Sequence, residues 1–373
     1  MALMIPNGPC FAHWSDNFAL TGDSGGSAPN DNNNGFGAAI TCGASSADGT
    51  AVTVMPALAH DCEYLWLGVS GTSITTGNAN AALMDLLIDP AGGVNWTSII
   101  DDLMVGFASG TSTQFTGSGS SMPLEYHFPL WLPAGASIGA RIRMQSATVP
   151  TVTRVMAQVC GGNKNPASWW CGQKVETVGT MDPSNSLGQL HSPAAPIAIT
   201  GAANNGSGLV RITVGSTTGF VTGDVHTVSS VAGTTEANGA WTITVIDSTH
   251  IDLVGSAFAN TYTSGGLISK FSSWTSLGSA TAARAGAAQW AVGGVTSTSA
   301  GGRAYDFQFG AGSTKIGPRV LRGMSTSELG ASIFRGPIFC DIPASTQLQV
   351  RGACNTSLSG ATTNLECAGY LVQ

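Results

Sequence analysis

Residues 209–215 read LVRITVG, residues 223–233 read GDVHTVSSVAG, and residues 238–256 read NGAWTITVIDSTHIDLVGS. Each run alternates apolar and polar residues, and each is bounded by glycine, which is typical of half-buried strands joined by turns. Residues 247–250, DSTH, lie between two such runs and predict a tight turn. We therefore expect residues 197–268 to form a small β module of its own.

The same short-strand pattern continues on both sides of this module. Apolar or alternating runs bounded by Gly, Pro, Asn or Ser occupy residues 51–55, 64–69, 83–88, 140–144 and 154–159. One segment, residues 96–105 (WTSIIDDLMV), has paired apolar positions three and four apart and predicts a helix. Many short strands with glycine-rich turns otherwise favour an all-β protein built of sandwiches or barrels.

Two parts of the chain echo each other. Residues 84–88 (MDLLI) match 305–309 (YDFQF), which pairs Asp85 with Asp306, and residues 130–134 (LWLPA) match 340–344 (CDIPA), which pairs Pro133 with Pro343. The order and spacing agree over roughly 90 residues, although chance similarity between glycine-rich sequences is an alternative explanation. We predict two similar, jelly-roll-like β-sandwich domains separated by the small module. The expected layout is an N-terminal arm (1–39), a first sandwich (40–177), a linker (178–196), the module (197–268) and a second sandwich (269–373).

Four short motifs in the module support a family resemblance. They are TGD at 222–224, ANGAWT at 237–242, DSTH at 247–250 and YTSGG at 262–266. In these motifs the module resembles the small β modules of structural and tail proteins of tailed bacteriophages, and the flanking halves resemble phage jelly-roll domains in architecture. The resemblance implies a structural component of the virion, in the neck or collar, the tail or the capsid surface. Such a protein is made in the bacterial cytoplasm and assembles with copies of itself and with other virion proteins.

The composition is compatible with that expectation. Only 9% of the residues are charged and the net charge is −7, with 14 basic residues scattered along the chain. This distribution produces no cationic field that would attract nucleic acid or an anionic membrane. We also find no secretory signal and no apolar run of the roughly 20 residues that a membrane span needs. The expected partners are neutral protein surfaces.

We find no pattern that favours catalysis or cofactor binding. The acidic residues are mostly isolated, and the adjacent pair at 101–102 is expected to be a solvated face, since neighbouring side chains point apart. The serine run at 119–121 and similar runs lack the strand-to-helix setting of a G-x-S-x-G nucleophile, and the six histidines are dispersed. The polar run at 31–35 (DNNNG) could offer oxygens to calcium, but it lacks the spaced acids of an EF-hand and is better explained as a surface loop. We predict no enzyme, no metal and no cofactor.

The eight cysteines include no CxxC pair. A hairpin turning near residues 360–361 would place Cys354 opposite Cys367, within disulfide range. Cys160 and Cys171 are a second candidate pair across a glycine-rich loop, and Cys10 could link subunits. Either the cysteines are small buried apolar groups, or they form such bonds once the particle has left the reducing cell.

Exposed aromatic residues are the candidate contacts with partners. Phe11, Trp14 and Phe18 lie in an N-terminal arm with too little periodicity for a core of its own, so we expect the arm to dock on a neighbouring copy. Trp169 and Trp170 lie together in a polar loop and could pack in a core, at a subunit interface, or against a sugar. The alternative function is therefore a receptor-recognition protein that binds host-surface glycan.

Overall fold

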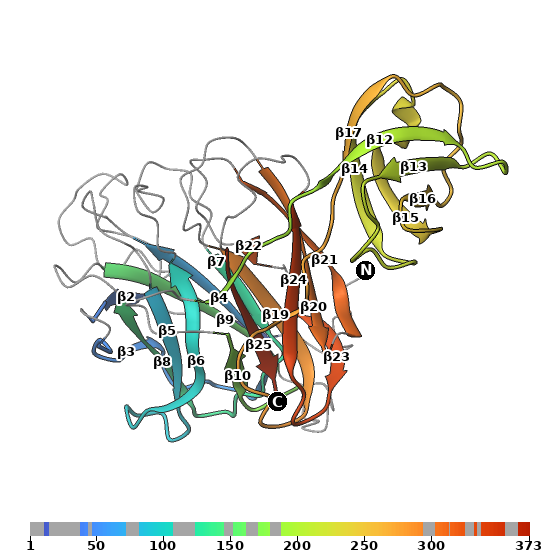
Figure 1. Cartoon of the computed structure of the whole chain (residues 1–373). Helices are drawn as coiled ribbons and strands as arrows, with labels where there is room; N and C mark the ends of the chain where they lie inside the picture. Colours follow the sequence, from blue (N-terminus) through green and yellow to red (C-terminus); the bar gives the residue numbers. More distant parts are fainter. Residues whose placement is uncertain are drawn as a thin grey trace.

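A computed structural model describes residues 11–14, 38–43, 47–71, 82–106, 124–144, 152–161, 171–179, 188–293, 303–312, 314–324, 332–333, 337–354 and 365–373. Strands dominate these residues, and the all-β prediction is confirmed. Within this part of the chain no helix has the length and apolar character needed to cross a membrane. The molecule comprises two sandwiches and a closed barrel that stands beyond the second sandwich, joined to it by two chain segments (Figure 1).

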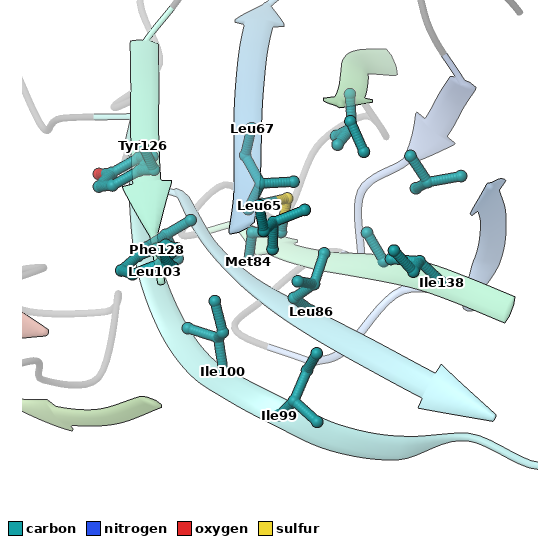
Figure 2. Close-up of a cluster of buried hydrophobic side chains, with 14 of the residues drawn as sticks. Leu65, Leu67, Met84, Leu86, Ile99, Ile100, Leu103, Tyr126, Phe128 and Ile138 are labelled. Carbon is teal, nitrogen blue, oxygen red and sulfur yellow. The ribbon is translucent and has the colours of Figure 1, made fainter. Parts of the chain in front are cut away.

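The first sandwich has two sheets. One has the order β2-β9-β4-β7, with β1 also pairing with β9, and the other has the order β3-β8-β5-β6. The strands are β1 (Phe11–Trp14), β2 (Ala38–Thr41), β3 (Val52–Met55), β4 (Cys62–Gly71), β5 (Ala82–Asp89), β6 (Thr97–Gly106), β7 (Leu124–Phe128), β8 (Ser137–Met144) and β9 (Val152–Gly161). Figure 2 shows apolar side chains from β4 to β8 converging in the core between the sheets.

The second sandwich repeats this topology. Its sheets have the orders β10-β25-β19-β23 and β18-β24-β20-β21. Strands β10 and β11 both pair with β25, just as β1 and β2 both pair with β9. The strands are β10 (Val175–Val178), β11 (Gln189–His191), β18 (Thr275–Ser276), β19 (Ala285–Gly293), β20 (Arg303–Ala311), β21 (Thr314–Met324), β22 (Ser332–Ile333), β23 (Ile338–Ile342), β24 (Leu348–Cys354) and β25 (Leu365–Val372). Eight positions in this order form a jelly roll, so the predicted fold of two similar sandwiches is confirmed.

The register corrects one correspondence. Asp85 lies opposite Arg141 in the β5–β8 pair, and Gln308 lies opposite Arg351 in the β20–β24 pair. In both sandwiches the arginine donates through Nε to that partner at 2.8 Å. The counterpart of Asp85 is thus Gln308, and the prediction of Asp306 was wrong by two residues.

The two sandwiches share one sheet and part of one core. Strand β10 pairs in parallel with β6 and antiparallel with β25, which produces a ten-stranded sheet. Second-sandwich residues enter the first core: Ala287, Ala291, Ala368, Tyr370 and Val372. We expected β10 inside the first sandwich and β11 inside the linker, but both pair with β25. The barrel is therefore inserted between the first and second strand positions of the second jelly roll.

The helix predicted at residues 96–105 is wrong, since these residues belong to β6. A register shift interrupts the β5–β6 ladder beside Asp101 and Asp102, and Asp102 has a φ of 59°. Such a bulge breaks the two-residue alternation and places the buried pairs on either side of it, Ile99–Ile100 and Leu103–Met104, at spacings that resemble those of a helix.

The small module is a closed six-stranded barrel of order β12-β13-β16-β15-β14-β17. Its strands are β12 (Ile197–Asn204), β13 (Val210–Val214), β14 (Val225–Ala232), β15 (Gly239–Val245), β16 (His250–Leu253) and β17 (Ser264–Ile268). The predicted turn joins β15 to β16, where Asp247 Oδ1 accepts hydrogen bonds from the backbone of Thr249 and His250 at 2.7 and 2.9 Å. Its own apolar core, which includes Ile212, Val228 and Ile251, is separate from the cores of the sandwiches.

Candidate functional site

A buried charged cluster joins the barrel to the second sandwich. Its centre is Arg351 on β24, whose Nη2 donates to Asp224 Oδ2 of the barrel at 2.6 Å. The guanidinium also lies 4.7 Å from the ring centres of Phe271 and Trp274, in the segment that follows the barrel. Lys315 on β21 forms a second ion pair with Asp224. We call Arg351, Asp224, Lys315, Gln308, Phe271 and Trp274 the Arg351 cluster.

Two of the three charges in this cluster are largely removed from water. The side chains of Arg351 and Asp224 are 8% and 5% exposed, whereas that of Lys315 is 42% exposed. Burial alone would raise the pKa of Asp224, but the hydrogen bonds and charges of Lys315 and Arg351 outweigh burial and lower it. Asp224 is thus ionised at neutral pH, and the buried guanidinium is neutralised from the barrel.

The two chain segments that enter and leave the barrel are bonded to the same strand. Ala194 N donates to Gly352 O at 3.0 Å and Ser272 N donates to that oxygen at 2.9 Å. His191 Nε2 lies 3.0 Å from Ser272 Oγ, which joins the two segments to each other. Burial lowers the pKa of His191 to about 4, so it is neutral at pH 7. These bonds, together with the Arg351 cluster, fix the barrel on β24.

The first sandwich has a related arrangement around Arg141 but no barrel. Arg141 Nη2 lies 3.0 Å from Asp48 Oδ2, and Arg141 is also bonded to Asp85. A third carboxylate nearby, Asp102, forms an ion pair with Arg143. Both partners of Arg141 come from its own sandwich, whereas Arg351 takes its carboxylate from the barrel.

The hairpin that was predicted to place Cys354 opposite Cys367 is wrong, because β24 pairs with β18 and β20 while β25 pairs with β19, β10 and β11. The two cysteines, both in the described part of the chain, are not joined in this structure. In a jelly roll the last two strands lie in opposite sheets and do not form a hairpin. Cys160 and Cys171 are not joined to each other either, and the Cys171 thiol donates to Glu63 O at 3.3 Å.

The structure places part of the N-terminal arm on its own sandwich. The backbone of Phe11 and Trp14 belongs to β1, which pairs with Gly161 to Gln158 of β9. Phe18, Trp169, Trp170 and Cys10 lie outside the described residues. The sequence patterns do not single out Arg351, and Asp224 appears in them only within the TGD motif. A charged residue inside an alternating strand pattern is unusual in a chain with few charges, and this signal could have singled out Arg351 and Asp224.

A row of aromatic residues lies on the outer face of the β4–β9 sheet. Leu65 and Leu67 point into the core, so Tyr64 and Trp66 point outward, and Trp66 is the cross-strand neighbour of His127. Tyr64 Oη lies 3.0 Å from His127 Nδ1. Burial, with a contribution from the nearby Cys160, raises the pKa of Tyr64 to about 12, so its hydroxyl is neutral. Among the described residues no group of three His, Cys, Asp or Glu side chains could hold a metal ion.

Comparisons with known proteins identify no family. No family model matches the sequence, and no curated protein matches it. Among solved structures, the tandem CBM22-1–CBM22-2 domains of Xyn10C from Paenibacillus barcinonensis give a TM-score of 0.22 at 8% identity, over 98% of this chain and 92% of that chain. PNGF-II gives a TM-score of 0.29 at 8% identity, over 90% of this chain and 65% of that chain. Both scores are too low to support a statement about function.

Proposed function

We propose that this chain is a structural component of a tailed-bacteriophage virion, in the neck or collar, the tail or the capsid surface, and that it acts by assembling with copies of itself. The observation that supports this most is the fusion of two jelly rolls through one ten-stranded sheet. Jelly rolls are recurrent in viral capsid proteins, and a continuous sheet with a shared core resists bending between its halves. The phage-like motifs of the barrel and the low charge of the chain agree with this role.

The test is the presence of the chain in purified particles. An antibody raised against the recombinant chain should label gradient-purified virions at one constant position, and mass spectrometry should find the chain in them at a fixed copy number. The proposal would be contradicted if the chain were found only in unassembled lysate fractions and the antibody did not label the virion.

The glycan-binding alternative has one observation in its favour, the outward row of Tyr64, Trp66 and His127. Aromatic faces can stack on sugar rings, and lectin domains also use jelly rolls. A glycan array probed with the wild-type chain and with Trp66→Ala separates the two functions. Specific binding that Trp66→Ala abolishes, in a chain that does not assemble with copies of itself, would favour the alternative.

A further inference from the structure

The junction between the two sandwiches is formed by adding one strand to a sheet edge. Strand β6 ends the β3-β8-β5-β6 sheet, and β10 extends it in parallel, with Val175 opposite Ile100. Two side-chain contacts accompany this pairing: Thr177 Oγ1 donates to the carbonyl of Asp101, and Lys174 Nζ lies 3.6 Å from Asp101 Oδ2. The first strand of one jelly roll thus binds the edge of the preceding one.

The chain has a second sheet edge like that of β6 and a second strand like β10. Strand β21 occupies in the second sandwich the place of β6, and in the described part of the chain it pairs only with β20. Strand β1 occupies the place of β10, since each pairs with the C-terminal end of the last strand of its sandwich. Within the described residues β1 pairs only with β9. One acceptor edge and one donor strand therefore have no partner strand among the described elements.

We infer that a second copy of this chain docks head to tail, with its β1 adding in parallel to the β21 edge as β10 adds to β6. This inference rests on the proposed assembly role and specifies the contact. Backbone pairing at a sheet edge is a general mode of association. The donor and acceptor surfaces are different, so the contact can repeat and generate a ring or a filament.

The bulge in β21 does not argue against this pairing. Gly317 has a φ of 72°, and the register of β21 shifts between its pairs with Phe307 and Phe309. Bulges often protect sheet edges. However, β6 carries a bulge at the corresponding place, beside Asp102, and still accepts β10. The bulge is therefore compatible with addition of a strand, and Pro318 of β21 limits that strand to the remaining backbone donors of the edge.

The face of the sheet next to β1 supplies a second, independent observation. In the second sandwich, the outer face of the β19–β25 sheet is buried against the first sandwich through Ala291, Tyr370 and other residues of the shared core. The corresponding face of the first sandwich carries Trp66 and Met156, which are only half-buried. The same docking between copies would cover these side chains. Aromatic residues and methionine are enriched at protein interfaces.

Sedimentation velocity on the full-length chain and four variants tests the contact. Deletion of residues 1–14 removes the donor strand, and Trp66→Lys charges the donor face. Val320→Pro and Leu321→Pro alter the acceptor strand. The backbone N–H groups of successive residues point to opposite sides of a strand, so only one of the two prolines removes an N–H that points away from β20. That variant, called the outward proline variant, is recognised by an unchanged melting temperature. Val94→Lys, at a 67% exposed position outside the contact, is the matched control.

We expect the wild type and Val94→Lys to sediment as multiples of 37.7 kDa that grow with concentration. The deletion, Trp66→Lys and the outward proline variant should each sediment as monomers. Mixing the deletion with the outward proline variant should give a 1:1 dimer that does not grow, because one chain retains the acceptor and the other retains the donor.

Several results would overturn the inference. Assembly of all variants like the wild type would place the contact elsewhere and leave the virion role intact. A wild-type chain that is monomeric at every concentration, or a mixture that forms no dimer, would also overturn it. Failure of the virion role is seen separately, by absence of the chain from particles. Binding of a polysaccharide by a monomeric wild type, lost in Trp66→Lys, would assign the aromatic face to glycan.

Discussion

Replacement of Asp224 by alanine should release the barrel from the second sandwich. The change leaves the guanidinium of Arg351 buried, with Gln308 and two aromatic rings as its remaining partners. Removing one member of a buried ion pair costs about 3–5 kcal/mol. We expect the lower end, about 3 kcal/mol, because Gln308 and the rings still stabilise the cation. Lys315 is exposed enough to return to water, so its loss adds little.

The loss should appear at the junction and not in the barrel itself. The barrel has its own core, so we expect it to remain folded while the equilibrium constant for docking falls by roughly 100-fold. Limited proteolysis should then cut the segments 192–196 and 269–274 much faster, and small-angle scattering should report a larger radius of gyration. Trp274, which lies on Arg351, should change its fluorescence.

Two further variants make the result specific. Asp224→Asn preserves the shape and one acceptor, so it should weaken docking less than alanine does. Asp252→Ala breaks an ion pair with Arg211 inside the barrel, and should leave proteolysis at the junction unchanged. Equal proteolysis rates and equal radii for Asp224→Ala and the wild type would refute the reasoning.

The same pair predicts the pH range of docking. The pKa of Asp224 is lower in the folded chain than its ordinary value of 3.8. The stabilisation is therefore complete well above pH 3.8 and is lost as the pH falls through the lower, folded value. Scattering at decreasing pH should show the radius increasing only in that acidic range. Release near neutral pH would contradict this assignment.

Three other substitutions test the junction and the shared core. The pKa of His191 falls from 6.5 to about 4 on folding, so the wild type should lose about 3 kcal/mol of stability as the pH falls from 6.5 to 4. In urea unfolding over that range, His191→Gln should lose less stability than the wild type. Tyr370→Phe leaves the buried N–H of Met104 without its 2.8 Å acceptor and should cost about 1–3 kcal/mol in the same assay. Gly369→Ala would place a methyl 2.4 Å from Trp290; this overpacking should cost about 1–3 kcal/mol of stability and lower the melting temperature.

The barrel and the duplication could be predicted from the sequence because both depend on local pattern. Alternation in runs bounded by glycine marks much of the barrel, and its first and last strands begin and end at residues 197 and 268 as expected. The helix error at residues 96–105 shows the limit of the same signal. A single bulge at Asp102 changes the apparent period, and no local pattern distinguishes it from a helical turn.

The strand partners and the Arg351 cluster could not be predicted in this way. The assumption that neighbouring strands form hairpins placed Cys354 beside Cys367, whereas jelly-roll connections alternate between sheets. Arg351 and Asp224 are 127 residues apart, and only the way the barrel is inserted brings them together. Short strands such as β10 and β11 also have too few residues to show a period, so their sequence was interpreted as part of a sandwich end and a linker.

The duplicated arginine explains why one sandwich carries the barrel and the other does not require it. Arg141 is paired with two carboxylates of its own sandwich, Asp85 and Asp48. At the position that corresponds to Asp85 the second sandwich has Gln308, which accepts a hydrogen bond but supplies no charge. A buried guanidinium without a counter-charge is strongly destabilising, so Arg351 depends on Asp224 from the inserted barrel. The exchange of a carboxylate for an amide at this one position thus makes the second jelly roll dependent on the barrel docked against it.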